Sequence, residues 1–213
     1  MDKRNKTMEY TLTKIHAFDF DGTLTKRDTL LEFIRFAKGG KFLLKCLLVH
    51  LPQLIAMKLG LRNNGRVKES VFAYCFKGMK LNDFNDVCVN FASANTRLLR
   101  PAAMLHLRKV MAEGCKVVVV SASIDNWVRP FFSGIDGVTV LCTMVEEHDG
   151  ILTGRFASAN CYGMEKVNRL RNFFPDINSY HLTAYGDSKG DIQMLDFADR
   201  GYYKPFRKGM PEP

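Results

Sequence analysis

The chain has 213 residues, more than one typical domain but too few for two independent ones, so we expect one core domain carrying an insertion. Its 46% hydrophobic and 25% charged residues argue against a fibrous or largely disordered protein. The formal net charge of +9 favours polyanionic, phosphorylated or anionic-membrane partners without choosing among them.

The first predicted element is a buried strand, Leu12–Phe20, which runs into the sequence DFDGTLT at Asp19–Thr25. In extended backbone, residues i and i+2 point to one face, so Asp19 and Asp21 address the same ligand. Gly22 permits a sharp turn and a close backbone approach. Two neighbouring carboxylates repel each other, and an all-oxygen set favours Mg²⁺. The alternative is a strand end that uses its aspartates only to form a turn.

A long region without any strand signal follows this motif, from Thr29 to about Asn95, and its periodicity predicts helices. We interpret it as a helical insertion after the first strand. The chain then divides into a predicted core domain, 1–28 and 96–213, and a predicted helical cap domain, 29–95. Breaks between helices are expected near Gly39-Gly40, Pro52, Asn63-Asn64-Gly65 and Gly78.

Within this insertion, the segment Phe42–Leu61 is rich in leucine but interrupted by Lys45, Pro52 and Lys58. A lysine at the centre of a membrane span costs roughly 2.5–3.5 kcal/mol on the insertion scale, so we do not expect a span. Two interpretations remain. The segment is either a basic amphipathic helix that lies on an anionic membrane, or a cap helix whose apolar face packs on its neighbours.

Two more apolar runs, Cys115–Val120 and His181–Tyr185, predict buried strands in the second half of the chain. Runs of this kind, separated by helix-period sequence, indicate a parallel sheet with helices on both faces. A small β-hairpin is predicted over Glu146–Phe156, with its turn at His148-Asp149-Gly150. The predicted helices are Pro101–Gly114, Ser123–Phe132 with Ser123 as N-cap, Met164–Phe174, and Lys189–Phe197 with Ser188 as cap.

Polar residues end the three predicted strands: Asp19 with Asp21, then Ser121, then Asp187. In an open α/β sheet the ligand sits outside the carboxyl ends of the strands, so we expect these residues to converge. The Ser121 hydroxyl and the following backbone N–H groups can hold a phosphate oxygen, although a serine after a strand is most often only a cap.

Two further motifs lie in the last quarter of the chain. Lys166 is in the first turn of its predicted helix, where a positive charge is unfavourable, which hints at a function; a solvated lysine is the alternative. The sequence GDSKGD at Gly186–Asp191 places two acids, Asp187 and Asp191, four residues apart at a turn into a helix.

Taken in order, these four motifs resemble those of the haloacid dehalogenase-like superfamily of phosphohydrolases, over about Leu12 to Phe206. The helical insertion and the hairpin at 149–154 are similar to those of its phosphoserine phosphatase-like subfamily. The resemblance implies an α/β fold, with a Rossmann-like parallel-sheet core, helices on both faces, and a helical cap inserted after the first strand.

The resemblance also implies a role for each motif residue. Asp19 would attack phosphorus and become an aspartyl phosphate, while Asp21 would protonate the leaving oxygen and then activate water. Ser121 and Lys166 would neutralise the phosphoryl oxygens. The implied ligands of Mg²⁺ are Asp19, the backbone carbonyl of Asp21, and Asp187, with Asp191 ordering metal-bound waters.

The chain departs from phosphoserine phosphatases in two places. Their second motif usually reads Ser-Gly, where this chain has Ser121-Ala122-Ser123, and the Glu–Arg pair of their cap has only loose counterparts here, Asp28 with Arg66 or Lys68. We therefore do not expect phosphoserine as the substrate. The expected substrate-binding residues are Gly22, Thr23, Asp28, Arg66, Ser121, Ala122 and Lys166.

The expected function is Mg²⁺-dependent hydrolysis of a phosphate monoester, either a small phosphometabolite or a lipid phosphate. The Leu-rich segment and Gly163–Val167 resemble bacterial phosphatidylglycerophosphatases of the same subfamily, which adds phosphatidylglycerophosphate to the candidate substrates. A phosphotransferase of the same fold and a non-catalytic basic binding protein are the alternatives. No nucleic-acid-binding motif is recognised, so no nucleic acid is expected as a partner.

The cysteines and the N-terminus predict the compartment. The six cysteines form no CxxC pair, which favours reduced thiols in a cytosolic protein over a zinc site or a disulfide framework. Met1–Lys14 is polar and lacks the apolar core of a secretory signal. We therefore expect a cytoplasmic monomer, with peripheral contact to the inner face of an anionic membrane if the Leu-rich helix meets lipid.

Overall fold

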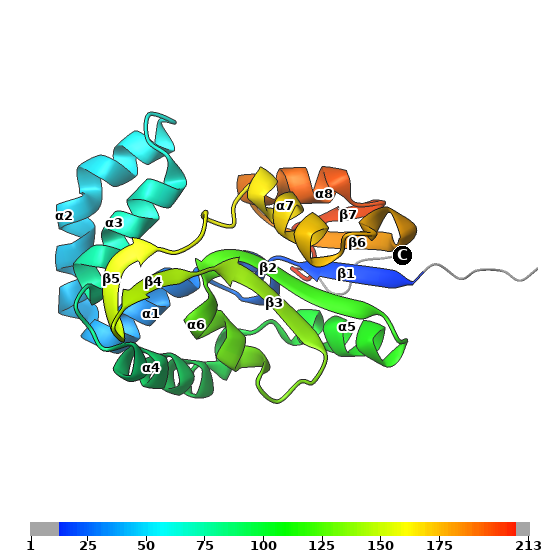
Figure 1. Cartoon of the computed structure of the whole chain (residues 1–213), viewed down its shortest axis with the longest axis horizontal. Coiled ribbons are helices and arrows are strands. Elements are labelled where there is room, and N and C mark those ends of the chain that lie inside the picture. Colours follow the sequence, from blue (N-terminus) through cyan, green and yellow to red (C-terminus); the bar gives the residue numbers. More distant parts are fainter. Residues whose placement is uncertain (1–12, 208–213) are drawn as a thin grey trace, which may run out of the picture.

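The computed structural model describes residues 13–207, so the expectation about a secretory signal falls mainly on residues outside the described part. At its centre is a sheet of five parallel strands in the order β3-β2-β1-β6-β7 (Figure 1). The three predicted apolar runs form the three inner strands, because only they are buried on both faces. The strands are β1 (Lys14–Phe18), β2 (Lys116–Ile124), β3 (Val138–Thr143), β6 (His181–Gly186) and β7 (Arg200–Tyr203).

Helices cover both faces of this sheet (Figure 1). Successive valines of β2 point to opposite faces: Val117 and Val119 pack in a core cluster with α5 (Pro101–Ala112). Val118 and Val120 pack in a second cluster with α7 (Met164–Phe173). The remaining core helices are α6 (Asp125–Val128), which continues as the 3₁₀ turn Arg129–Phe132, and α8 (Ile192–Phe197). The fold is the predicted α/β, Rossmann-like one.

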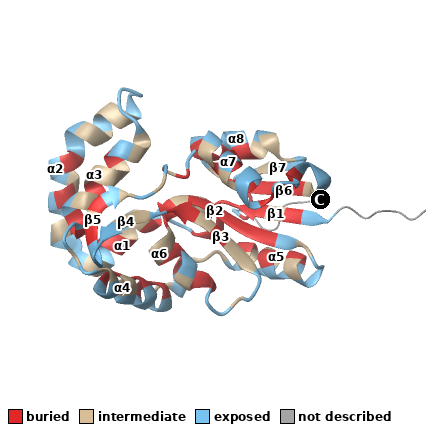
Figure 2. Cartoon of the chain, in the orientation of Figure 1, coloured by how far each residue is buried: buried red, intermediate tan, exposed pale blue. Residues whose placement is uncertain are grey.

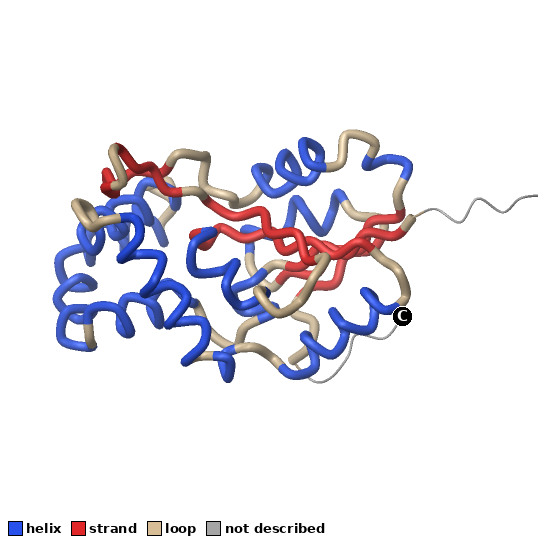
Figure 3. Tube along the Cα trace, turned by 60° about the horizontal axis from the view of Figure 1, so that its bottom comes forward, coloured by secondary structure: helices blue, strands red, loops and turns tan. Residues whose placement is uncertain are grey.

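Four helices between β1 and α5 form a unit beside the carboxyl ends of the strands (Figures 1 and 3). Phe33 lies at the centre of its aromatic core and contacts the rings of Phe76, Phe84, Phe91 and Trp127. We refer to this unit as the cap helices; the domain boundaries themselves stay a prediction. They are α1 (Thr29–Lys38), α2 (Gly40–Lys58), α3 (Asn64–Phe76) and α4 (Leu81–Ala94).

The predicted hairpin is confirmed as β4 (Val145–His148) and β5 (Ile151–Phe156), which pair antiparallel. It packs on the cap helices: the Gly78 N–H donates to the Leu152 carbonyl at 2.8 Å, and the Phe156 N–H donates to Glu69 Oε1 at 2.7 Å. The hairpin therefore ties the second half of the chain to the cap helices.

Two predictions about local structure are wrong, and two strands were missed. Ser123 is not an N-cap, because β2 continues to Ile124 and the helix begins at Asp125. Pro52 does not break α2, which runs through it; the proline is exposed, so water can bond the carbonyl that loses its N–H partner. The outer strands β3 and β7 were not predicted at all.

Candidate active site

A cavity of about 490 Å³ opens at the carboxyl ends of the strands, against the cap helices. Its floor is formed by the residues that follow the inner strands, so the predicted convergence is observed. The remaining walls come from the segment between β1 and α1, from α3, and from the loops before α7 and after β7. The predicted residues that line it are Asp19, Asp21, Gly22, Asp28, Ser121, Ala122, Lys166, Asp187 and Asp191.

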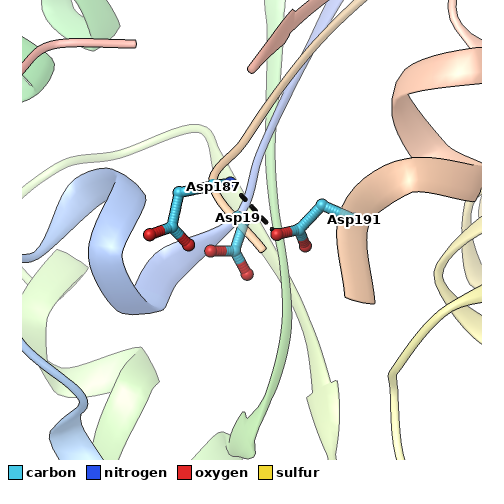
Figure 4. Close-up of side chains that lie close together, drawn as sticks. All are labelled: Asp19, Asp187 and Asp191. Carbon is cyan, nitrogen blue, oxygen red and sulfur yellow. Dashed lines mark hydrogen bonds between the residues drawn. The ribbon is translucent and has the colours of Figure 1, made fainter. Parts of the chain in front are cut away.

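Three aspartates gather at the floor of this cavity (Figure 4). Asp19 follows β1, and Asp187 and Asp191 follow β6; one carboxylate oxygen from each lies within 4.8 Å of the others. Gly22, at a φ of 79°, allows this approach, because a Cβ there would collide with the Asp187 carboxylate. The glycine is therefore required by close packing as well as by its backbone conformation.

Lys166 projects from α7 into the same cluster and is 2% exposed. Its Nζ donates to Asp19 Oδ1 at 2.6 Å and to Asp191 Oδ1 at 2.5 Å. A solvated lysine is thus excluded. The other oxygen of Asp191 accepts hydrogen bonds from the Asp187 N–H and from Ser188, whose side chain forms the predicted cap. Asp191 therefore fixes both the lysine and the loop that carries Asp187.

Burial shapes the protonation of these groups. It raises the pKa of Asp19 to about 7, although the Lys166 ammonium opposes the change. Burial likewise raises the pKa of Asp187, and the Asp191 carboxylate adds to that. For Asp191, Lys166 and the Ser188 hydrogen bonds outweigh burial and hold the pKa below its usual value. The two carboxylates overcome burial to raise the pKa of Lys166.

The donor set of this cluster fits Mg²⁺. It offers carboxylate oxygens only, which are the ligands that a hard cation prefers. Three carboxylates face two positive side chains, Lys166 and Arg207, whose guanidinium lies 2.9 Å from Asp187 Oδ2. A divalent cation would compensate the remaining negative charge. Both oxygens of Asp191 already accept hydrogen bonds, from Lys166 and from Ser188, and its role toward the metal stays a prediction.

The carboxylate of Asp21 lies outside the cluster, although it lines the cavity. Its Oδ1 accepts hydrogen bonds from the N–H and the hydroxyl of Thr29, both at 2.7 Å. Its Oδ2 accepts one from the Ser123 hydroxyl at 2.5 Å. Burial raises the pKa of Asp21, and the nearby Asp28 carboxylate adds to this effect. Thr29, the first residue of α1, and Ser123, near the end of β2, thus hold the Asp21 carboxyl group in place at the wall of the cavity.

Ser121 and Ala122 lie where β2 meets the cavity. The Ser121 hydroxyl accepts a hydrogen bond from the Ser123 N–H at 3.1 Å, within the last residues of β2. Thr23, by contrast, does not line the cavity. Its side chain is fully buried, and its hydroxyl has no hydrogen-bond partner among residues 13–207.

The two predicted cap contacts lie in different places. Asp28 lines the cavity and caps α1 by accepting from the Leu30 N–H. Arg66 lines a neighbouring hollow, between α3 and the segment after β5, whereas Lys68 lines the cavity described above. Lys68, the alternative partner for Asp28, is therefore the better placed of the two basic residues.

Several cavity residues were not predicted. Lys26 and Arg27 directly follow the first motif, so their position in sequence could have indicated them. Ser188 and Gly190 lie inside the motif Gly186–Asp191, so the motif could likewise have indicated them. The others, Asn64, Arg100, Tyr162 and Arg207, come from distant segments and carry no local signal; only the fold brings them to the cavity.

Several known proteins are similar to this chain in sequence or in architecture. Protein CicA of Caulobacter vibrioides is 37% identical over 194 residues, which cover 90% of this chain and 86% of that protein. A Bordetella pertussis Tohama I protein of unknown function superposes with a TM-score of 0.73 at 19% identity, covering 86% of each chain. A phosphoserine phosphatase, solved as a phospho-aspartyl intermediate analogue, superposes with a TM-score of 0.64 at 22% identity, covering 90% of this chain and 85% of that one.

These neighbours confirm the predicted phosphoserine phosphatase-like fold; the resemblance to phosphatidylglycerophosphatases stays a prediction. Residues 17–196 match the family described as haloacid dehalogenase-like hydrolase, a span that includes every motif discussed above. The chain therefore belongs to the haloacid dehalogenase-like hydrolase family.

Proposed function

We propose that this hydrolase is a Mg²⁺-dependent phosphatase that cleaves a phosphate monoester through an aspartyl phosphate on Asp19. The observation that carries the proposal is the buried cluster in which Lys166 bridges Asp19 and Asp191 beside Asp187, at the floor of an open cavity. The similarity to a phosphoserine phosphatase solved as a phospho-aspartyl intermediate analogue supports it.

In the first half of the proposed reaction, an Asp19 carboxylate oxygen bonds to phosphorus as the bond to the ester oxygen breaks. Lys166 holds Asp19 in place and, with Ser121, neutralises the phosphoryl oxygens. Asp21 gives its proton to the leaving oxygen, a contribution typically worth about 10²–10⁴-fold. Mg²⁺, held by Asp19, Asp187 and the Asp21 backbone carbonyl, would supply further positive charge to the phosphoryl group.

In the second half, Asp21 accepts a proton from a water molecule as that water attacks phosphorus. The bond between phosphorus and Asp19 breaks, and inorganic phosphate leaves. An aspartate at this position lets one group serve as acid and then as base, because the first half leaves it deprotonated. Its hydrogen bonds to Thr29 and Ser123 hold the carboxyl group next to the nucleophile.

The cavity also indicates what the substrate carries besides the phosphoryl group. Beyond Lys166, its lining includes five basic residues and the single additional acid Asp28. This favours a leaving group with further negative charge or hydroxyl groups, as in an anionic phosphometabolite or a lipid phosphate such as phosphatidylglycerophosphate. The five basic residues are Lys26, Arg27, Lys68, Arg100 and Arg207.

Hydrolysis of p-nitrophenyl phosphate, with Mg²⁺ and with excess chelator, tests the reaction class. We expect release of p-nitrophenol only with Mg²⁺, and full activity in chelator would remove the metal from the mechanism. Adding an alcohol acceptor distinguishes a phosphotransferase, which would yield phosphorylated acceptor in place of phosphate. No turnover on any member of a panel of phosphometabolites and lipid phosphates would favour a non-catalytic binding protein.

A further inference from the structure

The outer face of α2 departs from the usual behaviour of a surface helix. A helix with an apolar stripe normally buries it against a neighbour. Most of α2 is intermediate or exposed (Figure 2). Only Leu43, Cys46 and His50 are buried in it, and Cys46 and His50 contact Cys75 and Tyr74 of α3. The opposite side carries an apolar stripe at i, i+4, i+7 and i+11 that is exposed to solvent. This outer α2 face consists of Leu44, Leu48, Leu51 and Ile55, which are 60%, 61%, 48% and 51% exposed.

The exposed apolar surface continues beyond the helix toward the catalytic cavity. In the turn after α2, Leu59 and Leu61 are 69% and 76% exposed. Three residues further on, Asn64 begins α3 and lines the cavity. The exposed leucines of this turn are therefore close in sequence to a residue that lines the cavity.

Charge along this part of the chain is of one sign. The segment 33–68 contains eight lysines and arginines and no aspartate or glutamate. Lys41 lies in the first turn of α2, where a positive charge is unfavourable to the helix, so helix stability does not account for it. Exposed leucines with basic side chains at both ends of the helix are the pattern of a helix that lies on an anionic lipid surface.

We propose that the outer α2 face docks this protein on a membrane containing anionic lipid, with α2 lying in the plane of the interface. By length and composition, α2 could also cross a membrane, the one described helix that could. Spanning would separate Leu43, Cys46 and His50 from the cap core, whereas lying flat leaves those contacts intact. A symmetric dimer through this face would set lysines against lysines, because the segment has no acid to pair them.

Docking in this way would hold the cap side of the cavity near the lipid surface. The proposal does not depend on the phosphatase activity, because the outer α2 face includes no residue of the cavity. It does explain how a phosphate carried on a lipid could reach Asp19 without leaving the membrane.

Vesicle flotation of the full chain tests the proposal, with vesicles of phosphatidylcholine alone and of phosphatidylcholine mixed with phosphatidylglycerol. We expect binding to the mixed vesicles and a decrease with added salt. Leu48→Glu with Ile55→Glu should lower the bound fraction at least about tenfold. The matched control, Leu105→Glu with Val89→Glu, changes residues that are 62% and 52% exposed elsewhere and should bind like wild type.

A second pair of variants separates charge from apolar contact. Lys41→Gln with Lys45→Gln should reduce the preference for phosphatidylglycerol, and Lys109→Gln with Lys204→Gln should not. Equal flotation of wild type and Leu48→Glu/Ile55→Glu would overturn the proposal. So would a dimer in solution that those glutamates dissociate, or resistance of the wild type to alkaline extraction, which would indicate a spanning helix.

Turnover of p-nitrophenyl phosphate by the same variants distinguishes the two proposals. Unchanged turnover in Leu48→Glu/Ile55→Glu would show an intact fold, so that loss of flotation reports docking alone. If the wild type floats but never turns over substrate, the phosphatase proposal fails and the docking proposal stands. If it turns over substrate and does not float, the reverse holds.

Discussion

Proteins usually expose charged side chains and bury apolar ones. The edge of the sheet and the outer α2 face depart from this distribution in opposite ways. The sheet edge buries charge: Asp19, Lys166 and Asp191 are 6%, 2% and 1% exposed. The α2 face leaves large apolar side chains in solvent. Burying an ion costs several kcal/mol even after relaxation, and an exposed leucine forgoes about 1.5–3 kcal/mol of burial.

Stability therefore accounts for neither region, and the difference separates two functions. At the sheet edge, charges are held rigidly against each other by short hydrogen bonds, as chemistry at a fixed point requires. On α2, apolar groups form a flat and open surface, as contact with an extended partner requires. Substitutions in the first region should change turnover, and substitutions in the second should change localisation.

The largest effect is expected for Asp19→Asn. The amide cannot attack phosphorus, so turnover should fall by at least about 10³-fold, while the fold should be retained because the amide is nearly the same size. Steady-state assays, with circular dichroism as the control for folding, measure this. Wild-type turnover in the variant would mean that another group is the nucleophile.

A smaller effect is expected for Asp187→Ala, which removes a proposed metal ligand and leaves Asp19 and Lys166 in place. The Mg²⁺ concentration for half-maximal activity should rise at least about tenfold, since even indirect metal partners typically contribute that much. Titration of Mg²⁺ at saturating substrate measures it. An unchanged requirement would assign Asp187 to a different role, such as its ion pair with Arg207.

The cap helices offer a comparison of stability between their two sides. Phe33 is fully buried among aromatic rings. Changing it to alanine should lower the free energy of unfolding by about 3–5 kcal/mol. Leu48→Ala, on the exposed face, should stay within about 0.5 kcal/mol of wild type. Urea unfolding measures both. A large loss from Leu48→Ala would mean that the outer α2 face is covered in the free protein.

The last stability prediction concerns His16, in β1. His16 Nδ1 lies 2.9 Å from the Tyr185 hydroxyl, and burial, followed by the charges of His106, Lys14 and His181, lowers the pKa of His16 to about 4. The unfolded chain binds this proton more readily, with a pKa of about 6.5. The contribution to stability is therefore complete above pH 6.5 and is lost as the pH falls toward 4.

His16→Gln should remove that part of the pH dependence. Between neutral and mildly acidic pH, the urea concentration at the midpoint of unfolding should fall further for the wild type than for His16→Gln. Parallel decreases would show that His16 does not titrate differently in the folded and unfolded states.

The sequence was most informative where burial is complete. Apolar runs that end at polar residues predicted the inner strands and the residues that converge beyond them, because a strand covered on both faces has to be apolar throughout. The outer strand β7 begins Arg200-Gly201 and is mostly exposed, so no such run marks it. The end of β2 was missed because Ser121 and Ser123 are polar, although both are buried beside the cavity.

Residues that are distant in sequence from the motifs but lie in the site could not be predicted from local sequence patterns. Arg207 meets Asp187 only because β7 returns the chain to the sheet edge, and Lys68 reaches the cavity through the orientation of α3. Composition alone also left open whether the Leu-rich helix is buried. The structure shows that the inner side of α2 packs on the cap helices, whereas Leu44, Leu48, Leu51 and Ile55 on its outer side are 48–61% exposed. Contact of that outer side with lipid stays a proposal.

The central claim is that Asp19 carries the phosphoryl group between the two halves of the reaction. Asp21→Asn retains the nucleophile but cannot activate water. With p-nitrophenyl phosphate, whose leaving group departs without a proton, the intermediate should therefore still form and should accumulate. After incubation with substrate and Mg²⁺ and a rapid acid quench, peptide mass spectrometry should find one phosphoryl group on Asp19, absent from Asp19→Asn/Asp21→Asn. Phosphate release by Asp21→Asn with no phosphorylated peptide, or a phosphoryl group on another residue, would contradict the account.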